Sequence, residues 1–187
     1  MIFKNRLLGF VPLALFLALA GMTSGCATSM KSSAFADATP RLDPADFFTG
    51  HTRSWGVFET RDGTPTQRFS TETRGHWEGA ILCMEQDLIF ENGRRQHRSW
   101  RMRRIDSHHY LATANDMIGD ARGQAWGNAF TWSFTLALSP GNPLSRVRMT
   151  QWMYLQSDGR TLVNRDTIRK AGIVVAQVTE QFRKEPR

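Results

Sequence analysis

Cysteine is scarce in this chain of 187 residues, which contains only Cys26 and Cys83. Cys26 directly follows the small residues Ser24 and Gly25, whereas Cys83 lies in the apolar stretch 80–84. If Cys26 is consumed by modification, Cys83 has no intramolecular partner, and a disulfide framework is excluded. We therefore expect Cys83 to be a small buried hydrophobic residue rather than a catalytic thiol.

Acidic residues are absent before Asp37, and the chain instead begins with the basic sequence MIFKNR. An apolar run at 7–22 follows, and it is shorter than the roughly 20 residues needed to cross a bilayer. A basic start, a short apolar run and small residues before a cut site are typical of a secretory signal. Because these small residues end in Cys26, residues 1–25 are predicted to be a lipoprotein signal. An ordinary cleaved signal followed by an incidental cysteine is the alternative.

The predicted modification of Cys26 implies a lipid anchor, because lipoprotein cysteines are acylated before the signal is removed. Several acyl chains hold a protein stably on a membrane, whereas one chain does not. The next residue is Ala27 rather than aspartate, which in Gram-negative lipoproteins indicates the periplasmic face of the outer membrane. We therefore expect a cell-envelope protein with the membrane as partner. Nucleic acid is not an expected partner there, so the basic stretch 94–104 is interpreted as a solvated strand face, with anionic lipid headgroups as the alternative.

Long helical periodicity is absent after Gly50, and turn signals such as Asp62-Gly63, Asn92-Gly93 and Asp158-Gly159 separate β-rich segments. Pairs of this kind are strong hairpin signals. The chain is therefore predicted to be mainly β, an antiparallel lipocalin-like (calycin-type) barrel of about 8–10 strands with a short N-terminal helical turn. A barrel of this size can enclose one small ligand.

The predicted domain organisation has three parts. Residues 1–25 form the signal, residues 26–41 form a flexible tether because they are small and polar, and residues 42–187 form the barrel. Within the barrel domain, Asp43 before Pro44 predicts the start of the short helical turn.

The clearest strand signal is the strict alternation in 124–138, which predicts one long strand that bends near Gly127. Small residues occupy one face of this segment. If the strand lines a barrel, the opposite face points inward. That face carries Trp126, Asn128, Phe130, Trp132, Phe134, Leu136 and Leu138.

Catalytic signatures are absent: there is no Gly-x-Ser-x-Gly, no His-Glu-x-x-His and no phosphate-binding loop. The five histidines are scattered, whereas a zinc site needs three or four converging ligands. Neither a catalytic residue, a metal nor a cofactor is therefore expected. The most informative polar residues, Arg98, Asp116, Asn128 and Asn164, lie inside apolar patterns. They form either a structural network, with Asp116 paired to Arg98 and Asn128 bonded to a turn, or a pocket mouth that fixes the polar head of a ligand.

Several motifs are distributed between 42 and 183. They are Leu42-Asp43-Pro44, Phe47-Phe48-x-Gly50, Trp55-Gly56, Arg98-x-Trp100, Ala114-x-Asp116-x-x-Gly119-x-Ala121-x-Gly123, Gly127-Asn128-Ala129-x-x-Trp132, Trp152-Met153-Tyr154, Asn164 and Lys170-x-Gly172. Together they resemble a bacterial family of lipoproteins catalogued as a domain of unknown function. The resemblance implies no activity. It departs at Gln151, where we expect an acidic residue, and this departure argues against a catalytic role for that position.

The sequence favours an outer-membrane-tethered periplasmic lipoprotein that binds a lipid or another apolar small molecule. The residues expected at the ligand site are Trp55, Arg98, Trp100, Asp116, Asn128, Trp132, Trp152 and Asn164. One alternative is an enzyme on a lipocalin-like scaffold that acts on a fatty or isoprenoid substrate, with Asp116 and Arg98 as its first candidates. The other is a structural or assembly lipoprotein without a ligand.

Overall fold

Antiparallel hairpins generate nearly the whole fold. The computed structural model describes residues 30–139 and 141–186, so the predicted signal and Cys26 lie outside the described residues. The elements, in chain order, are η1 (Ser32–Phe35), α1 (Pro44–Phe48), β1 (Gly50–Thr60), β2 (Pro65–Glu78), β3 (Ile81–Phe90), β4 (Arg95–Arg104), β5 (His109–Ala114), β6 (Met117–Trp126), β7 (Ala129–Ala137), η2 (Pro143–Ser145), β8 (Arg146–Leu155), β9 (Thr161–Lys170) and β10 (Ile173–Lys184). None of the helices in this described part is long and apolar enough to cross a membrane.

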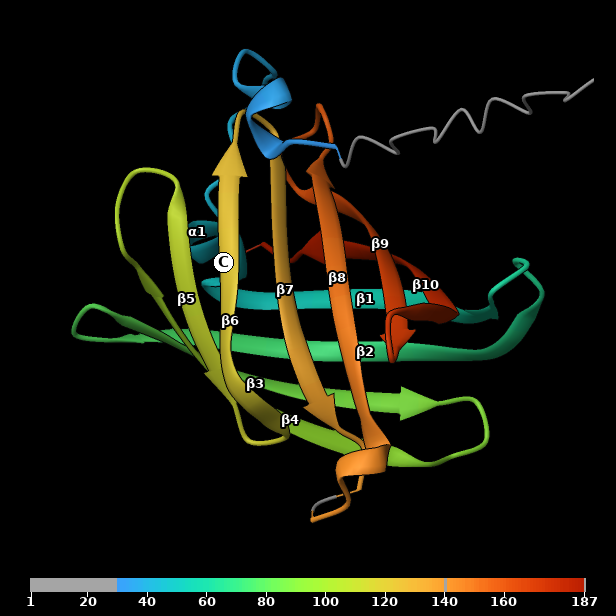
Figure 1. The fold of residues 1–187 in the computed structure, drawn as a ribbon. Coiled ribbons are helices and arrows are strands. Elements are labelled where there is room, and N and C mark those ends of the chain that lie inside the picture. The colour runs from blue at the N-terminus through green and yellow to red at the C-terminus, as the bar shows by residue number, and fades with distance from the viewer. Residues whose placement is uncertain (1–29, 140, 187) are drawn as a thin grey trace, which may run out of the picture.

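Each strand pairs with the next one in sequence, and β1 pairs with β10 to close the barrel (Figure 1). All pairings are antiparallel, so the predicted mainly β, lipocalin-like barrel is confirmed with ten strands in the described residues. Closure leaves no unpaired strand edge to attract other chains. The predicted turns at 62–63, 92–93 and 158–159 all connect consecutive strands.

The predicted single strand at 124–138 is wrong, because β6 ends at Trp126 and β7 begins at Ala129. Gly127 adopts a φ of +52°, which permits a tight turn at this point. Trp126 consequently points outward and stacks on His108, with 3.6 Å between the ring centroids. Within β7 the predicted inward face is confirmed, since Phe130, Trp132, Phe134 and Leu136 are all buried.

The short helix α1 covers one end of the barrel, and it begins as predicted. The Asp43 side chain accepts a hydrogen bond from the backbone N–H of Ala45 at 2.9 Å, and Pro44 occupies the first turn. Phe48 then packs edge-on against Phe182 of β10, with 5.5 Å between the ring centroids. Gly75 of β2 lets the helix approach closely, since a Cβ there would lie 2.0 Å from the carbonyl oxygen of Phe48.

Residues 30–41 lie against the barrel wall, which corrects the predicted flexible tether for this part of 26–41. The helix η1 rests beside β6 and β7, near the end of β6 and the start of β7 in Figure 1. Ser32 donates a hydrogen bond to Gln124 at 2.8 Å, and the Phe35 ring packs on Trp152 and Tyr154. Composition alone suggested a free linker, but this segment packs a half-buried aromatic ring, that of Phe35, on the outside of the sheet. We call residues 30–41 the N-terminal strap.

Candidate functional site

The barrel interior contains a cavity of about 750 Å³. Side chains from both halves of the barrel line it, and Phe48 of α1 closes it at one end. The cavity opens at the opposite end, where exposed Arg94 and Leu138 belong to its lining. This volume lies within the range of about 300–1,000 Å³ that is typical of small-molecule sites.

Aromatic and aliphatic side chains make most of the cavity wall. Trp100 of β4 stacks on Trp132 of β7 with 4.9 Å between the ring centroids, and Phe134 packs edge-on against both. A second group covers the part of the wall nearest the β1–β2 and β3–β4 turns and consists of Phe58, Phe69, Phe90 and Val178. The wall therefore presents apolar surface along the length of the barrel, as an apolar ligand requires.

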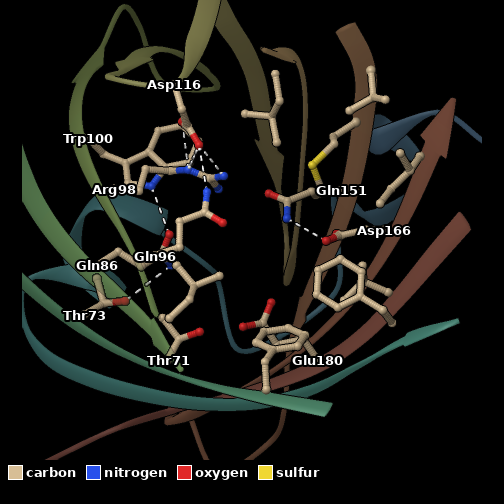
Figure 2. Close-up of a pocket in the computed structure, with 18 of the residues that line it drawn as sticks. Thr71, Thr73, Gln86, Gln96, Arg98, Trp100, Asp116, Gln151, Asp166 and Glu180 are labelled. Carbon is tan, nitrogen blue, oxygen red and sulfur yellow. Dashed lines mark hydrogen bonds and ion pairs between the residues drawn. The ribbon is translucent and has the colours of Figure 1, made fainter. Parts of the chain in front are cut away.

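Arg98 and Asp116 form a paired charge on one side of the cavity (Figure 2). Nε of Arg98 donates to both carboxylate oxygens at 2.9 Å, and Nη2 donates to Oδ2 at 2.7 Å. Gln96 adds a hydrogen bond to the same Oδ2 at 3.2 Å. This ion pair is the one expected under the structural alternative, and both of its members also line the cavity, as the alternative of a ligand site expected.

Two further carboxyl groups, Asp166 and Glu180, lie on the side of the cavity away from Arg98 (Figure 2). Asp166 is 2% exposed and Glu180 is 7% exposed. Burial raises the pKa of Glu180 to about 7, against weaker opposing effects from Ser54, Asn164 and Arg98. Burial, reinforced by the charge of Glu180, raises the pKa of Asp166 well above its ordinary value. Desolvation of this kind favours the protonated acid.

Gln151 connects the aromatic wall to these acids. Its Oε1 accepts a hydrogen bond from the Trp132 indole N–H, and its Nε2 donates to Oδ2 of Asp166 at 2.8 Å. Gln151 lies directly opposite Asp166 in the pairing of β8 with β9. Gln151, where an acidic residue was expected, is therefore adjacent to a buried acid, Asp166, on the next strand.

Four of the predicted site residues line the cavity: Arg98, Trp100, Asp116 and Trp132. Asn164 is fully buried behind the wall and donates to Glu180 at 3.3 Å. The remaining three lie elsewhere. Trp55 is 51% exposed on β1. Trp152 packs against Phe35 outside the barrel. Asn128, in the β6–β7 turn, donates a hydrogen bond to the carbonyl of Leu155.

These three positions, together with that of Asn164 behind the wall, correct the prediction that all eight residues share one pocket. Trp55 alternates with inward-facing Ser54, and Trp152 alternates with Gln151, so pleating places both rings outside. The inward residues Asp166, Glu180 and Gln151 were missed as candidates. The only sequence signal for Glu180 was its alternation with Val178 and Phe182 on β10.

The cavity mouth carries exposed apolar side chains. Leu138 and Val175 both line the cavity, and they are 65% and 43% exposed. Leu144 on the β7–β8 connection and Ile173 at the start of β10 are 78% and 63% exposed. The strand pairings place both connections at the same end of the barrel, so the mouth is rimmed by apolar surface.

A separate group on the barrel surface contains His76, Glu78 and Cys83, whose ligand atoms lie within 4.8 Å of one another. The guanidinium of Arg101 lies among them and donates to Cys83 Sγ at 3.2 Å and to Glu78 at 3.0 Å. A cation at this position would meet that positive charge. Burial also raises the pKa of the Cys83 thiol, which disfavours the thiolate that binds metals.

A closed, antiparallel ten-stranded barrel that surrounds an aromatic cavity defines a lipocalin-like class of fold. The sequence model of a family described as "Protein of unknown function (DUF3833)" matches residues 20–184, and the chain belongs to this family. The predicted family of unknown function is thereby confirmed. A search of curated proteins found no match.

Solved structures share the fold at low sequence identity. Rv2717c from M. tuberculosis superposes with a TM-score of 0.53 and 13% identity, covering 78% of this chain and 99% of that one. A Nostoc punctiforme protein of unknown function from the DUF3598 family superposes with a TM-score of 0.54 and 16% identity, covering 79% of this chain and 51% of that one. The S-type phycobiliprotein lyase CPES from Guillardia theta superposes with a TM-score of 0.56 and 6% identity, covering 79% of this chain and 96% of that one. At these identities the likeness concerns the fold alone.

Proposed function

We propose that the barrel binds a lipid or another apolar small molecule inside its cavity. The observation that carries this proposal is the aromatic-lined space of about 750 Å³, which opens at one end of the barrel. A barrel of similar strand number can enclose one small ligand. The apolar rim at Leu138, Leu144, Ile173 and Val175 supports passage of an apolar molecule between the cavity and its surroundings.

We further propose that Cys26 anchors the protein by acyl chains to the periplasmic face of the outer membrane. The support for this step is the amino-terminal sequence alone: a basic start, a short apolar run and the sequence Ser24-Gly25-Cys26. An anchored barrel of this kind would bind its ligand close to a membrane that contains apolar molecules.

A second candidate function is an enzyme on the same scaffold that acts on a fatty or isoprenoid substrate. Asp166 and Glu180 favour it, because buried acids with raised pKa values can hold a proton near neutral pH and act in proton transfer. Asp116 and Arg98 are less suited to this role than the sequence suggested, since each is occupied by the other. Conversion of a bound lipid, lost on changing Asp166→Asn or Glu180→Gln, would distinguish catalysis from binding.

A cavity-filling variant tests the binding proposal. Thr71 of β2 is 2% exposed and lines the cavity, whereas its neighbour Ser70 is on the outer face of the same strand. We expect the neutral apolar dye Nile red to fluoresce strongly with the wild type and with Ser70→Trp. Thr71→Trp should weaken dye affinity by at least about tenfold, because the new indole occupies the same space. Equal dye binding by both variants would contradict an internal site.

A further inference from the structure

Three neighbouring strands place hydrogen-bonding groups on the carboxyl side of the cavity. In the pairing of β8 with β9, Gln151 opposes Asp166, and in that of β9 with β10, Asn164 opposes Glu180. Asp166 and Glu180 therefore lie diagonally on the same inner surface. Both carboxyl groups belong to the cavity lining, and Figure 2 shows them on the same side of the pocket.

The hydrogen bonds around Asp166 and Glu180 leave some acceptor oxygens without a donor. Glu180 accepts from the Ser54 hydroxyl at 2.6 Å and from Asn164 Nδ2 at 3.3 Å, and Asp166 Oδ2 accepts from Gln151. Oδ1 of Asp166 and Oδ1 of Asn164 are buried without a hydrogen-bond partner. Buried polar atoms in folded proteins are nearly always paired. When Asp166 is ionised, the group missing from its Oδ1, which belongs to the cavity lining, is a donor.

The charges of the described lining residues lead to the same conclusion. The donors to Asp166 and Glu180, from Gln151, Ser54 and Asn164, are all neutral groups. Arg98 is bound to Asp116 across the cavity. Of the other lining residues that can be cationic, Arg94 is exposed at the mouth and lies over the Phe90 ring, 3.6 Å from its centroid, and His97 is bound to Asp87 and Glu85.

Two aromatic rings flank the acids. Phe182 lies two residues from Glu180 on the same face of β10, and Trp132 is linked to Asp166 through Gln151. Aromatic faces attract cations as well as apolar groups, and the attraction strengthens where water is excluded. This part of the wall can therefore surround a positive head group and the first carbons of its chain.

We propose that the molecule bound in the cavity carries a cationic N–H donor, such as a protonated amine, which lies between Asp166 and Glu180 while its apolar body follows the aromatic wall. This proposal rests on the proposed binding function and names the head group that it selects. In the empty cavity, burial raises the pKa of both acids and they bind protons. A ligand with one positive charge takes the place of one of those protons, and its charge offsets the cost of burying the carboxylate that loses it, while the other acid keeps its proton.

Three amphiphiles of equal chain length test the head group: decylamine, decanol and decanoic acid, titrated calorimetrically below micelle-forming concentrations. At about pH 8 the amine is cationic and the acid is anionic. We expect decylamine to bind the wild-type protein at least about tenfold more tightly than decanol, and decanoic acid to bind more weakly than either. Equal affinities for decylamine and decanol would overturn the cationic head group and leave the binding function intact. No binding of any of the three would overturn both.

Isosteric variants locate the preference. Asp166→Asn and Glu180→Gln keep side-chain shape and remove a charge, so each should reduce the amine preference while decanol binding persists. Asp120→Asn is the matched control, since it removes a carboxylate from an exposed position on β6. An amine preference that survives both interior substitutions would contradict the proposal. The comparison of the three ligands on the wild-type protein needs no variant to fold.

Discussion

Trp132 belongs both to the packing of the barrel and to the wall of its cavity. It stacks on Trp100, and its indole N–H donates to Gln151, which in turn binds Asp166. Trp132→Ala removes the stacked ring and leaves Gln151 without its donor. We expect the free energy of unfolding to fall by about 3 kcal/mol, at the lower end for a large aromatic because Trp132 already borders open space. Denaturant unfolding measures this difference.

Ser133 is the control for Trp132, because it follows on the same strand and points to the outer face. Its hydroxyl lies 3.0 Å from that of Thr150 on β8. Ser133→Ala should change stability by only about 0.5 kcal/mol. Small, equal effects of the two substitutions would mean that the alternation in β7 does not separate an inside from an outside.

Glu180 makes the stability of the unliganded barrel depend on pH. Its pKa is about 7 in the folded chain, above an ordinary value of 4.5, so the folded state binds a proton that the unfolded state has already lost. Stability is therefore highest below the unfolded pKa and falls as the pH rises through the folded one. Asp166, whose pKa is also raised by burial, acts in the same direction.

Glu180→Gln isolates this contribution, since it removes the titrating group and keeps the shape. The wild type loses this contribution as the pH rises from acidic to mildly alkaline, and the variant does not. Over that range the free energy of unfolding of the variant should therefore rise by on the order of 3 kcal/mol relative to that of the wild type. Unfolding curves of both proteins at several pH values measure this difference in unfolding free energy. Surface groups are the same in both proteins, so their contributions cancel. A difference that stays constant between about pH 4 and pH 8 would show that Glu180 titrates normally.

The acids of the cavity could not be predicted from the sequence because charged residues occupy both faces of their strands. In β9, Asn164, Arg165 and Asp166 follow one another, so alternation does not say which residues point inward. Only the register of β8, β9 and β10 shows that Asp166 and Glu180 share an inner surface. The Arg98–Asp116 pair was one of two alternatives that the sequence left open, and it was predictable because opposite charges favour pairing when buried.

At the scale of elements, the N-terminal strap depends on Gly127. A Cβ at this position would lie 1.7 Å from the Phe35 carbonyl oxygen and 2.9 Å from that of Ala38. Gly127→Ala should therefore displace the strap and free its backbone for cleavage by trypsin at Lys31 and Arg41, whose side chains are already exposed. Limited proteolysis measures this as faster cleavage at these two sites. Cleavage at the wild-type rate would mean that the strap does not need the close approach at Gly127.

Gly63→Ala is the matched control for Gly127→Ala. Gly63 also has a positive φ, +87°, but a Cβ added there would meet no atom within 4 Å. Both substitutions strain the backbone, typically by about 1 kcal/mol, and only one clashes with the strap. Cleavage of the strap should therefore stay at the wild-type rate in Gly63→Ala.

Most helices and strands could be predicted from the sequence, and the predictions that were wrong have physical causes. Hairpin signals and alternation predicted the antiparallel barrel, and Asp43-Pro44 predicted the start of α1. The division of 124–138 into two strands was missed because Gly127-Asn128 follows the alternating pattern without interrupting it. The packing of 30–41 was missed because it depends on Phe35 meeting Trp152 and Tyr154, which are distant in sequence.

For the whole molecule, the proposed lipid anchor rests on Cys26. Cys26→Ser should lose acylation, seen by mass spectrometry, and should leave the membrane fraction for the soluble one. Cys83→Ala is the control, because that buried thiol belongs to the barrel and has no part in the anchor. Continued detergent-sensitive association of Cys26→Ser with membranes would contradict the anchor and leave the cavity proposal untouched.

The most direct test of an interior binding site is native mass spectrometry of the protein purified from its own membranes in mild detergent. The wild type should carry a small apolar molecule in addition to the masses of the polypeptide and its acyl chains. Thr71→Trp should lack this added mass, because its indole fills the cavity, while Ser70→Trp should retain it. An added mass present equally in all three proteins would place the molecule outside the barrel. A wild type with no added mass, even after incubation with a membrane lipid extract, would contradict the proposed function.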